Sequence, residues 1–338
     1  MIGIIGFLVI SVGVGAGAEA GAGTGGKRVS ETARSLPTEG NAAVSGRPVL
    51  IAHRGLAQCF DISQVEWDTN TARIIFPPEH PYLENTIPSM EAAFAYGADI
   101  VEFDLRLTKD KELAVFHDYL LEYRTDGSGL VSERTMEELR TLDAGYGYTA
   151  DGGLSYPFRG KGIGLLPSLD DVLAAFPTQA FLIHVRDGGA EAAAILAERF
   201  ARMTPERLSR ITMYGDETTL RILRANYPEM KMLIFSDMKK GLLRYLFFGW
   251  TGQVPEALRN AEIHFPLSFA RFLWGWPDRF MERMEEAGVF FVLVDGKGRW
   301  SEGFDTEEDI ARIPPGFRGG IWTERIDIVG PLYGGKDR

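Results

Sequence analysis

Val101-Glu102-Phe103-Asp104-Leu105-Arg106 is the stretch of this 338-residue sequence that decides the fold. Side chains alternate between the two faces of a β-strand, so the apolar side chains share one face and the charged side chains the other. A parallel strand that is covered on both faces is normally apolar throughout. The alternation therefore indicates a strand whose apolar face meets helices and whose charged face points into a barrel. An exposed antiparallel strand with a polar outer face would show the same alternation.

A second stretch repeats the pattern. In Phe181-Leu182-Ile183-His184-Val185-Arg186 the apolar Phe181, Ile183 and Val185 share one face, and His184 and Arg186 share the other. A single such histidine would be interpreted as a core residue whose ring nitrogens have hydrogen-bond partners. Two strands with the same alternation favour a shared polar centre.

Short apolar β-type runs alternate with helical patterns along the chain, which predicts parallel strands joined by helical crossovers. The runs are Val49–Ala52, Ile100–Leu105, Leu113–Phe116, Ala180–Val185, Arg210–Met213, Met232–Phe235, Ala261–Phe265, Val289–Val294 and Gly320–Thr323. The helical patterns are Ile87–Tyr96, Met136–Leu142, Leu169–Ala175, Glu191–Ala201, Glu217–Ala225 and Pro277–Ala287.

One of these runs is too many for an eight-stranded barrel. Only Thr108–Glu112 separates the second run from the third, and a parallel crossover needs a dozen or more residues. We therefore expect Leu113–Phe116 to return as a hairpin beside Ile100–Leu105. The others predict an α/β fold, a (β/α)8 TIM barrel with long loops over its C-terminal face. A doubly wound open sheet is the alternative, but the sequence lacks its G-x-G-x-x-G turn.

The composition restricts the partners. The net charge is −11, which argues against nucleic acid as a partner, because phosphate backbones need a basic surface. An anionic substrate would need a cation between it and an acidic site. The single cysteine, Cys59, excludes an intramolecular disulfide and a cluster of thiol metal ligands.

The N-terminus predicts export. Residues 2–14 form an apolar run and small residues follow up to Ala22, which is typical of a secretory signal and its cleavage site, although no Lys or Arg precedes Lys27. We expect a signal peptide at 1–22, a flexible leader at 23–47, the barrel domain at 48–330 and a tail at 331–338. The expected location is periplasmic or secreted, and a retained N-terminal membrane anchor is the alternative.

Polar motifs follow the expected strands. His53-Arg54-Gly55 ends the first strand, His117-Asp118 ends the hairpin return, and Glu84-Asn85-Thr86 leads into the first helix. In a barrel, the C-terminal ends of the strands and the loops after them build the active site. Two histidines can serve as general acid and base, and an arginine and a metal can stabilise phosphoryl oxygens. Buried carboxylates on the second strand suit a hard divalent cation. This inventory indicates cleavage of a phosphodiester.

The same motifs resemble those of the glycerophosphodiester phosphodiesterase family. They are Ala52-His53-Arg54-Gly55, Glu84-Asn85-Thr86, Gly97-Ala98-Asp99, Glu102-x-Asp104, Thr108-Lys109-Asp110, His117-Asp118, Leu166-Pro167-Ser168-Leu169 and Gly320-Ile321-Trp322-Thr323. The resemblance spans roughly residues 48–330. It implies a (β/α)8 barrel that hydrolyses glycerophosphodiesters to glycerol 3-phosphate and an alcohol.

The resemblance also implies roles for individual residues. His53 and His117 match the catalytic pair, and Arg54 matches the phosphate contact. Glu102 and Asp104 match ligands of Ca²⁺ or Mg²⁺, with Glu84 in or beside that shell.

This sequence departs from the family in the fourth strand, where Glu-x-Lys is usual and His184 and Arg186 stand instead. Arg186 can still bind phosphate. His184 can ligate a metal, but imidazole prefers softer ions, so Mn²⁺ or Zn²⁺ joins the candidates.

Two long loops are expected to narrow or change the substrate class relative to the family. Leu56–Leu83 and Tyr119–Leu166 follow expected strands and predict lids or binding loops over the mouth. The segment Lys239–Phe248 combines basic and apolar residues and suggests peripheral membrane contact, a buried helix or loop being the alternative.

Two rivals to the hydrolase remain: a barrel of the phospholipase C or D type that acts on intact lipid, and a catalytically impaired phosphodiester-binding protein. The sequence leaves the oligomeric state open.

Overall fold

The computed structural model describes residues 46–334, and in this part of the chain eight parallel strands form a barrel in the order β6-β5-β4-β2-β1-β9-β8-β7. The barrel closes between β6 and β7 through a parallel bridge from Met232 to Ala261. The strands are β1 Val49–Ala52, β2 Ile100–Leu107, β4 Ala180–Val185, β5 Ile211–Gly215, β6 Met232–Leu233, β7 Glu262–Pro266, β8 Phe290–Val294 and β9 Gly320–Thr323. The predicted TIM barrel is confirmed.

The third predicted run is the expected hairpin. Strand β3, Leu113–Val115, pairs antiparallel with β2, and Leu105 lies opposite Val115. This return places the next residues, His117 and Asp118, beside the C-terminal half of β2.

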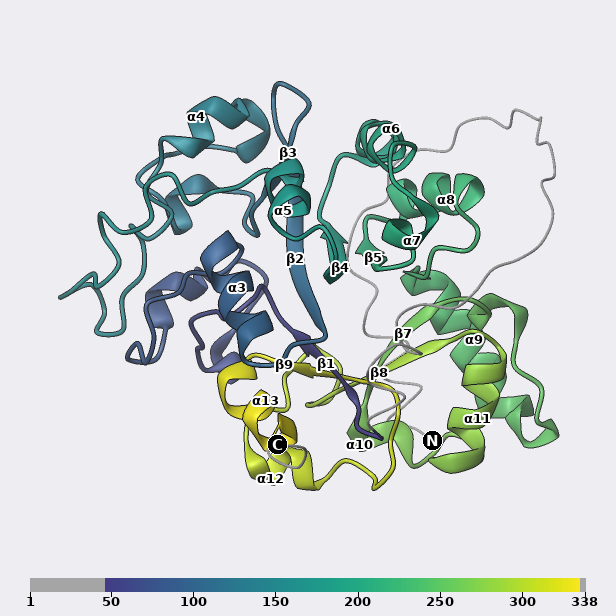
Figure 1. Cartoon of the computed structure of the whole chain (residues 1–338). Helices are drawn as coiled ribbons and strands as arrows, with labels where there is room; N and C mark the ends of the chain where they lie inside the picture. Colours follow the sequence, from purple (N-terminus) through teal and green to yellow (C-terminus); the bar gives the residue numbers. More distant parts are fainter. Residues whose placement is uncertain (1–45, 335–338) are drawn as a thin grey trace.

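Helices surround the barrel in the order that the crossovers require, with α6, α7 and α8 outside β4 and β5 (Figure 1). The helices of the described residues are α3 Ile87–Ala95, α4 Met136–Arg140, α5 Leu169–Ala175, α6 Gly189–Phe200, α7 Pro205–Leu208, α8 Glu217–Asn226, α9 Phe235–Phe248, α10 Leu267–Ala270, α11 Asp278–Glu286, α12 Glu307–Ala311 and α13 Ile326–Gly334. Local sequence sets their starts. Thr86 caps α3 by accepting a hydrogen bond from the Ser89 amide, for example.

The alternation in β2 and β4 produces two cores. Val101, Phe103 and Phe181 point outward and pack with the helices in the main core. Inside the barrel, a separate apolar cluster that includes Leu182 and Trp322 fills the space. Glu102 and Asp104 are fully buried and lie on the inward face of β2. The charged face of the deciding stretch therefore points into the barrel, as predicted.

The sixth strand is shorter than expected. We predicted a strand at Met232–Phe235, but β6 ends at Leu233 and α9 begins at Phe235. The segment Lys239–Phe248, for which a buried helix or loop was the alternative to membrane contact, lies within α9. Helix α13 ends at Gly334. No helix of the described residues is long and apolar enough to cross a membrane. The predicted signal peptide, almost all of the leader and the end of the tail lie outside the described residues.

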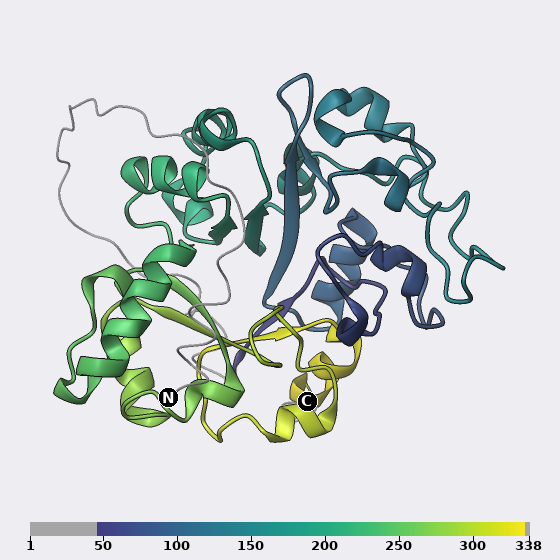
Figure 2. The ribbon, with the colours of Figure 1, turned by 180° about the vertical axis from the view of Figure 1, so that it is seen from behind.

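The two long loops pack against each other and form what we call the cap, residues Leu56–Leu83 and Tyr119–Leu166. Ala72, Ile75 and Leu83 from the first loop share a small apolar core with Tyr148 and Phe158 from the second. The cap loops lie together on one side of the barrel (Figure 2). Their common core indicates that the two loops pack as one unit over the C-terminal face and are not two independent lids.

Candidate active site

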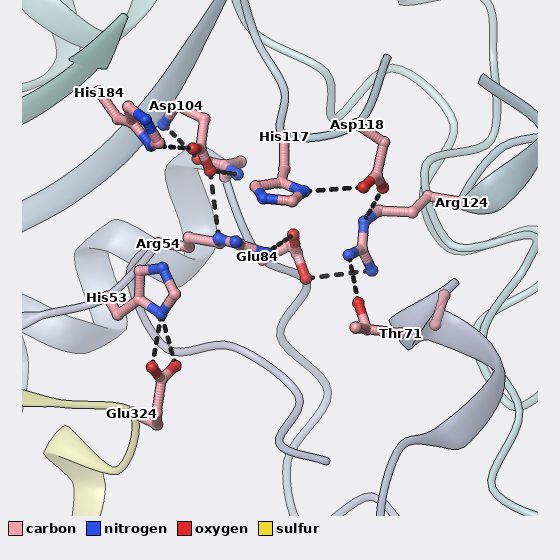
Figure 3. Close-up of polar contacts among 12 residues, drawn as sticks. His53, Arg54, Thr71, Glu84, Asp104, His117, Asp118, Arg124, His184 and Glu324 are labelled. Carbon is pink, nitrogen blue, oxygen red and sulfur yellow. Dashed lines mark hydrogen bonds and ion pairs between the residues drawn. The ribbon is translucent and has the colours of Figure 1, made fainter. Parts of the chain in front are cut away.

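All of the predicted site residues converge at the C-terminal ends of the strands. Most of them lie on β1, β2 and β4 or directly after these strands, His117 follows the hairpin return β3, and Glu84 lies between the first cap loop and α3 (Figure 3). The described structure thus brings together His53, Arg54, Glu84, Glu102, Asp104, His117, His184 and Arg186.

The two carboxylates of β2 have different surroundings. Glu102 Oε1 accepts a hydrogen bond from the Tyr214 hydroxyl at 2.7 Å, and Oε2 accepts one from the Arg54 amide at 3.1 Å. Burial and the neighbouring Asp104 charge raise the pKa of Glu102. Asp104 Oδ2 accepts a hydrogen bond from Asn85 Nδ2 at 3.0 Å and lies 3.2 Å from Arg54 Nε. Burial opposes ionisation of Asp104, but Arg54, His117 and His184 together outweigh burial, and the pKa of Asp104 falls well below its usual range.

A group of residues that could hold a cation lies where β2 and β4 are side by side. Asp104 pairs with His184 across the two strands, and His184 Nδ1 lies 2.9 Å from Asp104 Oδ1. One ligand atom each from Glu102, Asp104 and His184 lies within 4.8 Å of the others. Asp104 Oδ1 is buried and has no hydrogen-bond donor of suitable geometry among the described residues. Two buried carboxylates and a ring nitrogen fit a divalent cation, which would balance their charge.

Glu84 forms ion pairs with two arginines of the site, Arg54 and Arg124. Its Oε1 lies 2.9 Å from Arg54 NH1 and its Oε2 lies 3.2 Å from Arg124 NH1. Burial opposes ionisation, but Arg124 and Arg54 lower the pKa of Glu84 below its ordinary value. Glu84 therefore holds two guanidinium groups, and it lies outside the group of ligand atoms from Glu102, Asp104 and His184.

His53 at the end of β1 is held by a carboxylate from the end of β9. Its Nδ1 donates to Glu324, 2.6 Å and 2.7 Å from the two oxygens. Its Nε2 lies 3.8 Å from Glu102 Oε2, and its ring lies against Trp322. Burial lowers the pKa of His53, but the carboxylates of Glu324 and Glu102 together outweigh burial, so the pKa is raised. The ring keeps one nitrogen free to exchange a proton with a ligand.

His117 is held in a similar way by its sequence neighbour. Its Nδ1 donates to Asp118 Oδ1 at 2.7 Å, and Asp118 Oδ2 lies 2.6 Å from Arg124 Nε. Burial and the Arg54 charge lower the pKa of His117 to about 4. Arg124 also contacts Glu84, so one buried guanidinium links the support of His117 with that of Arg54.

His184 and Arg186 form the β4 side of the site. The His184 ring stacks on Tyr214, with 4.0 Å between ring centroids. Burial lowers the pKa of His184 to about 3, so its ring is neutral and has a lone pair available. Arg186 NH1 lies 3.9 Å from Asp104 Oδ1, and its side chain remains 23% exposed. A charged group that is still partly accessible at the mouth is suited to an anionic ligand.

Three residues of the site were not singled out from the sequence: Glu324, Tyr214 and Arg124. Glu324 directly follows β9 and Tyr214 lies near the end of β5, so the rule that strand ends build the site could have found both. The other two histidines of the chain, His80 and His264, lack the neighbouring polar motifs of the site, and the sequence predicts structural roles for both. His80 bonds to the backbone of the cap, whereas His264 lies inside the barrel, 2.7 Å from Glu262.

The fold and the site define a class: a TIM barrel with a histidine pair, arginines and two buried carboxylates at the strand ends. Within this class, the chain belongs to the glycerophosphoryl diester phosphodiesterase family, whose model matches residues 53–239, more than half of the chain.

Sequence similarity to individual proteins agrees with this family. The chain is 33% identical over 152 residues to a glycerophosphodiester phosphodiesterase of Bacillus subtilis, which covers 44% of this chain and 43% of that protein. It is 36% identical over 102 residues to one of Caldanaerobacter subterraneus, covering 30% of this chain and 38% of the relative. The chain thus spans less than half the length of these curated relatives.

Solved structures share the fold over most of their length. The glycerophosphodiester phosphodiesterase of Agrobacterium tumefaciens superposes with a TM-score of 0.57 at 20% identity and covers 85% of this chain and 100% of its own. A phosphodiesterase of Oleispira antarctica, solved with the product sn-glycerol-3-phosphate, gives 0.54 at 18% identity and covers 86% and 98%. At these identities the likeness shows the fold.

Proposed function

We propose that this protein is a glycerophosphodiester phosphodiesterase that uses a divalent cation and releases glycerol 3-phosphate and an alcohol. One observation carries the proposal. His53 and His117 each have Nδ1 held by a carboxylate, and Arg54 lies close enough to both rings to act on the pKa of each. Two oriented imidazoles near one cationic group are suited to proton transfer on either side of a phosphoryl group.

The proposed reaction is hydrolysis of the diester with these residues in place. Water attacks phosphorus, a new P–O bond forms, and the P–O bond to the alcohol breaks. One histidine takes the proton of the attacking water, and the other gives a proton to the departing alcohol oxygen. Arg54 and Arg186 bind the non-bridging phosphoryl oxygens, where guanidinium groups form strong charge-assisted hydrogen bonds.

The cation is proposed to bind Glu102, Asp104 and His184. When bound, a divalent cation supplies Lewis-acid stabilisation of charge on phosphoryl oxygens. The two carboxylates support Ca²⁺ or Mg²⁺, and the imidazole nitrogen adds Mn²⁺ or Zn²⁺ as candidates. Glu84 is supported as a residue beside this shell, because both of its oxygens are taken by arginines.

The direct test is a panel of glycerophosphodiesters assayed with and without a chelator, with coupled detection of glycerol 3-phosphate. We expect turnover of at least one diester, loss of turnover with chelator and recovery with a divalent cation. Turnover by a preparation that elemental analysis finds free of metal would contradict the cation role. Faster release of diacylglycerol or phosphatidate from intact lipid would favour a phospholipase-type activity. Binding of diesters without any turnover would favour a binding protein.

We also propose export to the periplasm or the medium, supported by the apolar run at 2–14 and the small residues after it. In a secreting host, N-terminal sequencing of the mature protein should begin after Ala18 or Ala22. A mature chain that keeps Met1 and stays in the membrane fraction would instead favour an anchor.

A further inference from the structure

Helix α9 has apolar side chains on both sides. Met238, Leu242 and Tyr245 are buried against the barrel. On the outer side, Leu243, Phe247 and Phe248 are 39%, 52% and 59% exposed, although an outer face of a surface helix is normally polar. The apolar outer face therefore needs an explanation that packing within the described residues does not give.

Neighbouring tryptophans extend this face. Trp250 follows the helix and is 65% exposed, and Trp274 is 46% exposed. The Trp274 indole donates to the Leu246 carbonyl, which fixes its ring against the end of α9. Arg283 donates to the carbonyls of Gly249 and Trp274 and so ties the two segments together. We define the α9 face as Leu243, Phe247, Phe248, Trp250 and Trp274. It lies on the side of the barrel away from the cap (Figure 1, Figure 2).

Basic residues lie beside the α9 face, in a protein whose net charge is −11. Lys240 and Arg244 are exposed and lie two turns and one turn, respectively, before the exposed phenylalanines. No acidic residue lies between Asp237 and Glu256. Each of these two carboxylates already faces an arginine, Asp237 at 3.0 Å from Arg221 and Glu256 at 3.2 Å from Arg259. Between Asp237 and Glu256 the chain therefore carries only basic charges.

We propose that the α9 face docks on an anionic phospholipid bilayer, with Phe247, Phe248 and Trp250 inserted at the headgroup level and Lys240 and Arg244 on the lipid phosphates. Aromatic side chains beside basic ones are the composition of interfacial helices. Charge favours this occupant over a second copy of the chain docked on the same segment. Lys240 and Arg244 would meet phosphates on an anionic bilayer, whereas two copies that met through this segment would bring like charges together. This inference does not depend on the proposed activity.

The test is co-sedimentation of the full chain with two kinds of vesicle, pure phosphatidylcholine and phosphatidylcholine mixed with phosphatidylglycerol. Because the N-terminal apolar run is present in every variant, differences between variants report on the α9 face. We expect the wild type to prefer the anionic vesicles. The double variant Phe248→Ser, Trp250→Ser should bind them at least about tenfold more weakly, from the apolar area that it removes.

Charge and control variants complete the design. Lys240→Gln with Arg244→Gln should reduce binding to the anionic vesicles about fivefold for each charge, from about 1 kcal/mol per basic residue near such a surface, and leave binding to phosphatidylcholine unchanged. Phe76→Ser is the matched control, since Phe76 in the cap is 53% exposed, and it should bind like the wild type. All variants should keep wild-type turnover of a soluble diester, so the result is separable from failure of the proposed activity. Wild-type vesicle binding by the aromatic variant would overturn the proposal. So would an altered sedimentation coefficient without altered vesicle binding, which would identify a contact between copies.

Discussion

The two predicted catalytic histidines have the same local contact and opposite electrostatic surroundings. Each donates from Nδ1 to a carboxylate, His53 to Glu324 at 2.6 Å and His117 to Asp118 at 2.7 Å. Asp118 is in turn paired with Arg124. Glu324 has no arginine or lysine partner among the described residues, and its neighbour Asp305 is a buried carboxyl whose pKa burial and Glu324 raise to about 7.

This difference indicates that the groups beside the carboxylate partner influence the pKa of each histidine. Burial lowers the pKa of both rings, but at His53 the charges of Glu324 and Glu102 together outweigh burial and raise the pKa. At His117, burial and Arg54 act together, Arg124 offsets the Asp118 charge, and the pKa falls to about 4. At neutral pH His117 is therefore neutral, and His53 is the ring that holds a proton more readily.

Removing Arg124 should produce the largest effect, because it is the group that distinguishes the two regions. Arg124→Met leaves Asp118 and Glu84 buried without this partner, and breaking a buried ion pair costs about 3–5 kcal/mol. The lowered pKa values of Asp118 and Glu84 add stability that is full above about pH 4 and is lost as the pH falls. Chemical denaturation across pH 3–8 should show a less stable variant with a weaker acid dependence.

The control for this variant is an exposed arginine. Arg202 pairs with Glu198 on the surface of α6, and its side chain is 73% exposed. Arg202→Met should change the free energy of unfolding by less than about 1 kcal/mol. Equal losses in the two variants would mean that the buried network has no special role in His117's region.

The next largest effect tests whether both histidines transfer protons. His53→Ala and His117→Ala should each lower kcat by about 100-fold or more, the usual scale for a positioned acid or base. The fold should survive, as judged by the thermal unfolding midpoint. His80→Ala is the matched control, since His80 bonds only within the cap, and it should keep nearly full turnover. Near wild-type kcat in either test variant would remove that histidine from the mechanism.

The region of His117 could be predicted from the sequence, and the support of His53 could not. His117 and Asp118 are adjacent, and the alternation that places Glu102, Asp104 and His184 in the barrel is a property of six-residue stretches. Glu324 reaches His53 from 271 residues away, and only closure of the barrel beside β1 brings β9 there.

Helix α9 shows a second limit of sequence reasoning. A helical pattern needs a polar face, and α9 carries Leu243 and Phe247 on its outer side as well as Met238 and Leu242 on its inner side. The apolar residues therefore lose the period of 3.6, and the segment looks like a run without a preferred face. The feature that hid the helix is the same one that supports membrane docking.

A smaller effect sharpens the comparison of the two carboxylates. Glu324→Gln removes an uncompensated charge, so the pKa of His53 should fall by about one unit or more, and the limb of the pH–rate profile that His53 sets should move to lower pH. Asp118→Asn should shift the His117 limb less, because Arg124 already offsets the Asp118 charge. Profiles of kcat/KM from pH 4 to 9 measure both shifts. A larger shift for Asp118→Asn would show that Arg124 does not offset the effect of the Asp118 charge on the pKa of His117.

The smallest effect concerns His184, a third histidine whose Nδ1 faces a carboxylate, at 2.9 Å from Asp104. In the first two pairs the carboxylate orients the ring, whereas here we propose that both groups bind one cation. His184→Glu would then supply a third carboxylate and tighten Ca²⁺ or Mg²⁺ binding by about fivefold or more, because affinity for hard ions rises with ligand charge. His184→Gln is the control, since it offers an oxygen without the charge and should not tighten binding. Without cation, the added carboxylate lies beside Glu102 and Asp104 and should lower the thermal midpoint, and saturating Ca²⁺ or Mg²⁺ should restore it. Isothermal titration and thermal unfolding measure the two quantities. A lower midpoint that neither ion restores, with no gain in affinity, would show that His184 is a packed core residue and that its contact with Asp104 is of the same kind as the other two pairs.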